Sequence, residues 1–203
     1  MVLDTELSAL VLTDLLPEVL HDWNNECAVV SGLAHLLAAS NDQGAAIRDR
    51  AAALGLTGER MESEAWCAST LVNLLAGDSP ASERDDALEL ALELASSAIR
   101  RRGGAWSSSG MVVEASCEGR AAMALAAWIR WCALEIPRFS MEPRRVSSDR
   151  EVAPIRWMAG GEGMSERPIA LLRTLAPLGW RIESLTQGAR WQVHFCWDSS
   201  QAT

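Results

Sequence analysis

The chain has 203 residues, of which 49% are hydrophobic, and a formal net charge of −9. This length and hydrophobic content suffice to bury a sizeable core in one large domain or two small ones. All 18 basic residues are arginines, and the acidic balance argues against the clustered basic face that nucleic-acid binding requires. We therefore expect no nucleic-acid partner, and interpret the one dense basic run, 100–102, as a solvated helix end rather than an anion site.

The cysteines are widely spaced, odd in number and never arranged as a close metal-binding pair. This usage predicts reduced thiols in a cytoplasmic protein, most of them small core residues, and no zinc site. The N-terminus lacks a basic region, and no apolar run approaches the roughly 18 residues needed to span a bilayer, so we expect no membrane association. The five cysteines are Cys27, Cys67, Cys117, Cys132 and Cys196.

Residues 15–40 carry apolar and small side chains at alternating spacings of four and three, which predicts a helix packed in a bundle. Thr13 is a candidate N-cap, Pro17 would then sit in the first turn, and residues 3–12 would form a separate short helix. The seam positions are Leu16, Leu20, Trp23, Cys27, Val30, Ala34 and Leu37.

A polar turn at 40–44 precedes a second segment with the same alternation, which runs to residue 76. The two segments predict long antiparallel helices joined as a hairpin. Because each helix leaves a second apolar flank exposed, we expect the hairpin to dimerise into a four-helix bundle. The seam positions of the second helix are Ile47, Ala51, Leu54, Gly58, Met61, Ala65, Ala68, Val72 and Leu75.

The remainder of the chain mixes helix and strand patterns, which predicts an α+β layer with helices on one face of a sheet. We accordingly divide the chain into a helical hairpin domain at 1–76, a linker at 77–86 that is rich in Gly, Pro, Ser and charge, and an α/β domain at 87–203. The expected elements are a helix at 87–101, a strand at 110–119, a helix at 120–137, a strand at 151–160, a helix at 165–179 capped by Ser165, and a hairpin at 180–197 turning at Gln187-Gly188.

Three polar residues of the first long helix form the candidate site. His21 and Asn25 are four residues apart and therefore neighbours on a helix, and Asp22 follows His21 directly. Position 21 lies beside the seam, so the imidazole should be partly accessible. An accessible imidazole next to a carboxylate is a competent nucleophile, although such a pair on a helix is also a common surface feature without function.

The run His21-Asp22-Trp23-Asn24-Asn25, on the first helix of a self-pairing hairpin, resembles the H-box of bacterial two-component histidine kinases. That motif reads His, an acidic residue, two variable positions, then Asn or Thr. The resemblance implies that His21 is the phosphoacceptor, that Asp22 is its acid/base neighbour and that Asn25 could position a water for dephosphorylating a partner. A proline commonly follows the motif in that family, whereas this chain has Glu26 at that position.

Residues 87–203 follow the element order of the kinase ATP-binding domain, but its nucleotide residues are absent. Such a domain needs an Asn on its central helix and an Asp-x-Gly-x-Gly loop; the helix 120–137 has no Asn, and "MAGGEGM" has no Asp. Gly160, Gly161 and Gly163 are interpreted as a plain flexible turn rather than a decayed phosphate loop. We therefore expect no ATP binding.

A kinase-like order of elements with an H-box and no nucleotide site resembles the ChpT-type bacterial histidine phosphotransferases, in order along nearly the whole chain and in recognisable sequence over 19–37. The resemblance implies a cytoplasmic homodimeric phosphotransferase that carries a phosphoryl group on His21 between response-regulator receiver domains. It implies no stably bound cofactor, with Mg²⁺ supplied by the receiver. The alternatives are a non-catalytic pseudokinase-like adaptor, a phosphatase of a response regulator, and a kinase with an unconventional nucleotide site.

Other conspicuous residues receive structural interpretations. The tryptophans that cluster in the second half are expected to pack in the core, because no basic patch accompanies them as base stacking would require. His35 is interpreted as a helix-face residue and His194 as a strand-face residue. Glu62 and Glu64 are expected to be solvated.

Overall fold

The computed structural model describes residues 3–39, 44–77, 84–101, 117–145, 155–162, 166–186 and 190–198, and it is a mixed α+β structure, as predicted. The helical elements are α1 (Thr5–Leu10), η1 (Val11–Leu15, a π-helix), α2 (Leu16–Ala39), α3 (Ala45–Ala76), α4 (Ala87–Arg101), α5 (Gly119–Glu135), α6 (Glu166–Arg173) and η2 (Ala176–Leu178, a 3₁₀ turn). The strands are β1 (Ser140–Arg145), β2 (Ile155–Glu162), β3 (Trp180–Thr186) and β4 (Arg190–Trp197).

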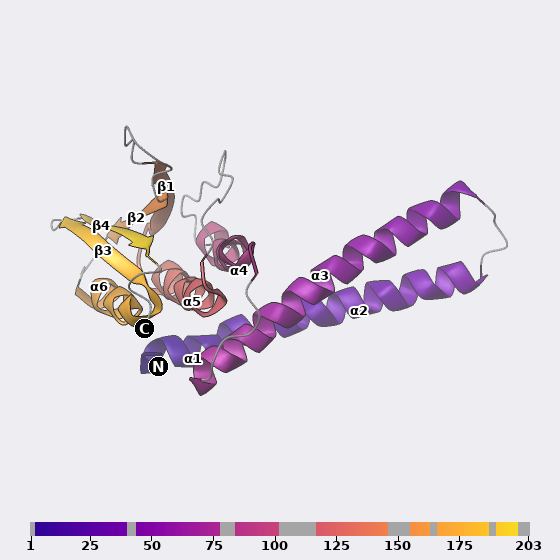
Figure 1. Cartoon of the computed structure of the whole chain (residues 1–203), viewed down its shortest axis with the longest axis horizontal. Coiled ribbons are helices and arrows are strands. Elements are labelled where there is room, and N and C mark those ends of the chain that lie inside the picture. The colour runs from indigo at the N-terminus through magenta and orange to yellow at the C-terminus, as the bar shows by residue number, and fades with distance from the viewer. Residues whose placement is uncertain are drawn as a thin grey trace.

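Helices α2 and α3 form a long antiparallel hairpin that projects from the rest of the molecule (Figure 1). The prediction of two long helices from the alternating spacing is therefore confirmed. Helix α3 ends at Ala76, where Gly77 takes a left-handed φ of 73° and its N–H bonds to the carbonyl of Asn73. Residues 40–43 of the predicted turn and 78–83 of the predicted linker lie outside the described residues.

The predicted start of the first long helix is wrong. Elements α1, η1 and α2 follow one another without a break, and the capping side chain is that of Asp4, which accepts the N–H of Glu6 at 3.0 Å. Thr13 is not a cap, because its hydroxyl donates to the carbonyl of Ala9 at 2.9 Å. Pro17 lacks an N–H and would crowd the preceding turn of an α-helix. The π turn immediately before it provides a wider turn there, so the helix continues.

The π turn also keeps the buried side of this helix in register. Its widened geometry appears as a bond from the Leu16 N–H to the carbonyl of Val11, five residues back. A spacing of four drifts by about 40° per step around an ordinary α-helix, and a wider turn reverses part of that drift. Five residues at this spacing consequently remain on one side and at most 5% exposed: Leu3, Leu7, Val11, Leu15 and Val19.

The sheet has the order β1-β2-β4-β3, and every neighbouring pair is antiparallel. Helices α5 and α6 lie against one of its faces, as predicted (Figure 1). The helix at 87–101 and the hairpin at 180–197 are confirmed, whereas β1 was not predicted. Of the strand predicted at 110–119, residues 110–116 lie outside the described part, and Gly119 instead begins α5. Ser165 and the turn at 187–189 also lie outside it.

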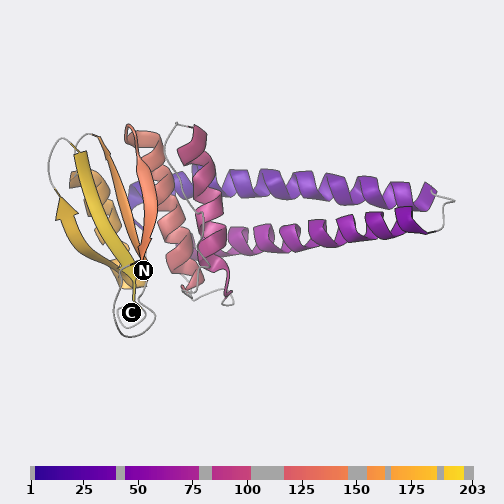
Figure 2. The same cartoon turned by 90° about the horizontal axis from the view of Figure 1, so that it is seen from above.

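Helix α5 runs through the centre of the core, between the sheet and the base of the hairpin (Figure 2). Trp128 of α5 is fully buried and donates its indole N–H to the carbonyl of Pro168 in α6 at 2.8 Å. Trp180 of β3 donates to the carbonyl of Ala121 at 2.8 Å. Trp191 is buried as well, and Trp131 and Trp197 pack partly buried against the core. The prediction that the tryptophans pack in the core is confirmed for these five, whereas the side chain of Trp157 lies outside the described part. One continuous apolar cluster joins the N-terminal helix, α3, α4, α5 and the sheet.

Candidate functional site

The three candidate residues lie together on the exposed side of α2. Nδ1 of His21 is 3.2 Å from Oδ1 of Asp22 and 3.1 Å from Nδ2 of Asn25. The side chain of His21 is 73% exposed and that of Asp22 is 55% exposed. The predicted contact between positions 21 and 25 is therefore confirmed, and so is the accessibility of the imidazole. A neutral histidine in this setting can present a ring nitrogen to a partner molecule.

The two contacts at Nδ1 require opposite tautomers of a neutral ring. A hydrogen bond to the Asp22 carboxylate needs a proton on Nδ1, whereas a bond from the Asn25 amide N–H needs a lone pair there. Half a turn of the amide about its terminal bond places the oxygen of Asn25 at that position. Nδ1–H is then shared by two oxygens, and Nε2 carries the lone pair. In this tautomer Nε2 has the free lone pair, and the Asp22 carboxylate lies beside the protonated ring nitrogen.

Acidic side chains of both hairpin helices lie close to Asp22. Glu26 on α2 forms an ion pair with Arg60 on α3, with Nη1 of Arg60 3.5 Å from Oε1 of Glu26. Glu64 on α3 is only partly exposed, so the expectation that it is solvated is wrong, whereas Glu62 is exposed as expected. Burial raises the pKa of the Glu64 carboxyl above its ordinary value; Asp22 and Glu26 raise it further, and Arg60 lowers it.

Sequence reasoning did not place Glu64 close to Asp22 and Glu26. Glu64 belongs to another helix, and local spacing cannot show which residues of two helices meet. It also missed Arg130 of α5, which is buried against the helix that carries His21.

The glycines interpreted as a flexible turn instead belong to a strand. Gly160 and Gly161 both lie in β2, and Gly163 is outside the described residues. A Cβ at position 160 would lie 2.6 Å from the carbonyl oxygen of Trp191, and one at 161 would lie 2.4 Å from Cγ2 of Ile136. Close packing therefore explains these two glycines, and the interpretation as a turn is wrong.

Large hydrophobic side chains remain exposed along the helical hairpin and the π turn that precedes it. Their exposed fractions run from 37% for Trp23 to 62% for Leu56, and the set comprises Leu12, Leu20, Trp23, Val29, Leu36, Ile47, Leu56 and Val72. Some predicted seam positions, including Cys27 and Val30, are partly buried, while others, including Leu20, belong to this exposed set. Several large apolar side chains left exposed on one helical pair are typical of an interaction surface.

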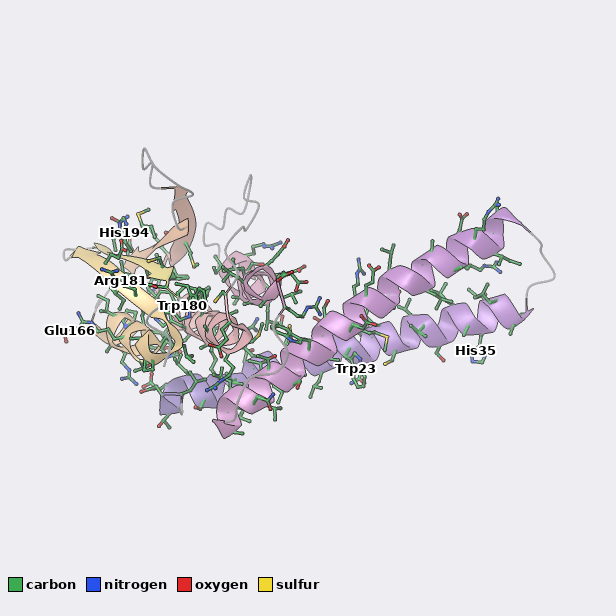
Figure 3. All side chains as sticks on the ribbon, viewed as in Figure 1. Trp23, His35, Glu166, Trp180, Arg181 and His194 are labelled. Atoms are coloured by element: carbon green, nitrogen blue, oxygen red, sulfur yellow. The ribbon has the colours of Figure 1, made fainter. Side chains whose placement is uncertain are left out.

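The remaining histidines lie far from the candidate site. His35 is exposed near the distal end of α2, and His194 lies on the face of the sheet opposite α6 (Figure 3). His194 alternates along β4 with the buried Val193 and Phe195, so its interpretation as a strand-face residue is confirmed. Within the residues that the structure describes, no group of three or more His, Cys, Asp or Glu side chains could hold a metal ion.

Among the described helices, none is both long enough and apolar enough to cross a membrane.

Comparisons with known proteins add no family assignment. No protein-family model matches the chain, and no curated protein is significantly similar to it.

Proposed function

We propose that the chain is a histidine phosphotransferase of a two-component phosphorelay, with His21 as the phosphoryl carrier. The supporting observation is the group at His21: an exposed imidazole whose Nδ1 lies 3.2 Å from the Asp22 carboxylate and 3.1 Å from the Asn25 amide. The arrangement holds one ring nitrogen and leaves the other open to a partner. Local geometry thus agrees with the H-box resemblance of residues 21–25.

The transfer is an in-line displacement at phosphorus. Nε2 of His21 forms a bond to the phosphorus of a receiver's aspartyl phosphate, and the bond from phosphorus to the aspartyl oxygen breaks and leaves a carboxylate. The ring keeps its proton on Nδ1, and the carboxylate of Asp22 balances the resulting positive charge. A Mg²⁺ ion held by the receiver supplies charge neutralisation at the phosphoryl oxygens. The same steps in reverse pass the phosphoryl group to a second receiver.

The proposed working form is a homodimer in which two helical hairpins make a four-helix bundle. The exposed apolar set on the hairpin supports this assembly, because a single hairpin leaves those side chains in water. Leu20 and Trp23 flank His21 in sequence, so the dimer would cover apolar surface next to the site while the imidazole stays open.

The α/β part is proposed to be a degenerate form of the kinase ATP-binding domain that no longer binds ATP. Its central helix α5 carries no asparagine, and no asparagine follows Asn73 anywhere in the chain. The glycines of β2 are accounted for by packing against Trp191 and Ile136. The phosphoryl group would therefore come from a partner protein.

Incubation of the purified protein with phosphorylated receiver domains tests the proposal. Wild-type protein should acquire an acid-labile, base-stable label, His21→Ala should acquire none, and His35→Ala should label normally. His35 is the matched control because it is an exposed histidine on the same helix. Labelling directly from ATP would refute the relay in favour of a kinase.

Two further outcomes separate the relay from its alternatives. If the protein binds receivers but acquires no label, and the receivers keep their phosphate, the relay is refuted in favour of an adaptor. Loss of receiver phosphate without a labelled protein, abolished by Asn25→Ala, would indicate a phosphatase, since an amide 3.1 Å from the ring could hold a water near the bound receiver.

A further inference from the structure

A buried arginine joins the helix that carries His21 to the α/β part of the molecule. Arg130 of α5 has a side chain that is 2% exposed and forms ion pairs with Asp14 in η1 and Glu18 in α2. Its Nη1 also donates to the carbonyl of Leu94 at 3.2 Å and to the hydroxyl of Ser97 at 3.1 Å, both in α4. Ser97 donates to Oε1 of Glu18 at 3.2 Å, so three separate segments meet at one guanidinium.

These contacts fix the helix in rotation as well as in distance. A guanidinium is planar and presents its N–H groups in a rigid fork, so its partners must sit at set positions around it. The apolar stripe that ends at Val19 packs on the same core, but apolar contacts are not directional and allow small rotations. Asp14 and Glu18 lie one turn apart and hold two successive turns of the helix to the same group.

The second of these turns leads directly to His21. Glu18 precedes His21 by three residues, so the two side chains are neighbours on the helix surface. Because the backbone between them is continuous α-helix, a rotation at Glu18 is passed on to His21 without loss. The direction in which the imidazole faces is therefore set by a group in the α/β part.

We propose that Arg130 is a positioning residue for His21, acting through Glu18. This inference rests on the proposed phosphotransfer. A receiver domain docks as a rigid body and brings its aspartyl phosphate to one point, so His21 must face that point for in-line attack. A displacement of about 1 Å can slow such a reaction by about 10²-fold. A small phosphodonor approaches from any direction and does not need this alignment.

Arg130→Met tests the proposal by comparing two phosphodonors. Transfer from a phosphorylated receiver should fall between about 10-fold and 10²-fold in kcat, with a smaller change in KM. Phosphorylation by phosphoramidate, in which Nε2 bonds to phosphorus and ammonia leaves, should stay within about twofold, because it needs only an open imidazole. Arg130→Lys should restore the receiver rate only in part, since an ammonium lacks the fork.

Arg167→Met is the matched control, because Arg167 also links the α/β part to the N-terminal helix. Its Nη2 lies 2.8 Å from Oε1 of Glu6, but the side chain is 48% exposed, and exposed pairs fix geometry poorly. Its receiver rate should equal that of wild type. Amide hydrogen exchange over 18–25 should be faster in Arg130→Met than in Arg167→Met.

Two results would overturn the proposal: an unchanged receiver rate in folded Arg130→Met, or an equal loss with both donors. If Arg130→Met fails to fold, Glu18→Gln decides in its place, because it retains an oxygen for Ser97 and removes only the charge facing Arg130. If wild-type protein accepts phosphate from neither donor, the proposed function is lost. Hydrogen exchange then decides alone whether Arg130 holds the helix.

Discussion

The carboxyl group of Glu64 lies at the α2–α3 contact, and its replacement by glutamine should stabilise the protein. Its Oε2 is buried, and no hydrogen-bond partner for it occurs among the described residues. Burial raises its pKa, and the negative charges of Asp22 and Glu26 raise it further, against a smaller lowering by Arg60. The ionised form of Glu64 is therefore unfavourable in the folded protein.

The gain in stability from Glu64→Gln can be estimated from the cost of burying Oε2 without a hydrogen bond. An unsatisfied buried polar atom costs about 1–3 kcal/mol, and partial exposure of this side chain places it near the lower end. Glutamine removes the charge, keeps the size, and offers an N–H₂ donor to the acidic neighbours. We expect Glu64→Gln to raise the free energy of unfolding by about 1 kcal/mol at pH 8.

The gain should depend on pH in one direction. The pKa of Glu64 is higher in the folded than in the unfolded chain, so the folded state binds the proton more tightly. Wild-type stability therefore falls as pH rises from the unfolded value of 4.5 through the folded value, and the penalty is complete above it. The advantage of Glu64→Gln should be largest at pH 8 and should disappear as pH falls toward 4.5.

Urea unfolding from pH 8 down to pH 5, at one fixed protomer concentration, measures this difference. Fixed concentration matters because dimerisation would contribute to the apparent stability. Glu62→Gln is the control, since Glu62 is exposed on the same helix, and it should change stability little at any pH. The reasoning is refuted if Glu64→Gln gains nothing at pH 8, or if its gain is the same throughout the pH range.

Two core substitutions and one at an exposed helix position carry further predictions, all measurable by urea unfolding. Trp128→Phe removes the bond to the carbonyl of Pro168 and leaves that carbonyl buried, so stability should fall by about 2 kcal/mol; a loss below about 0.5 kcal/mol would contradict the role of this bond. Gly119→Ala places a Cβ 2.7 Å from Cζ2 of Trp66 and should destabilise by about 1–3 kcal/mol. Gly55→Ala meets nothing within 4 Å on exposed helix and should instead stabilise by about 0.5–1 kcal/mol; the same sign for both glycines would be inconsistent with the packing at Trp66.

Local spacing predicted the elements whose form depends on near neighbours. The hairpin helices, the helix at 87–101 and the β-hairpin at 180–197 all carry a regular period, and a period is visible in sequence. The start of the first helix was missed because Pro17 usually marks a first turn. A π turn has no sequence signature of that strength, so the alternative in which the helix passes through Pro17 was not visible.

Features that depend on distant contacts were not predictable in the same way. Strand β1 has Pro143 in its centre and no alternation, and its place at the edge of the sheet comes from backbone pairing with β2. The packing partners of Gly160 and Gly161 lie elsewhere in the chain, so local sequence cannot distinguish these glycines from those of a turn. In each case the cause is tertiary.

The same distinction between local spacing and distant contacts applies to the candidate site. The contact between His21 and Asn25 follows from a spacing of four and was predicted, whereas Glu64 and Arg130 reach the region from other helices. One signal for Arg130 was present: it is the only charged residue between Ala121 and Ala133 on a helix that is otherwise apolar. A charge in such a setting is rarely buried without a partner.

The π turn fixes the rotation of the first part of the N-terminal helix relative to the part that carries His21. Its hydrogen bond spans five residues where that of an α-helix spans four, and one residue corresponds to a rotation of about 100°. Deleting Thr13, an exposed residue, would therefore turn the segment that fills the core against the segment that carries His21. The direction in which the histidine points is thus encoded partly as a number of residues, and an indel there would redirect it without altering any side chain of the site.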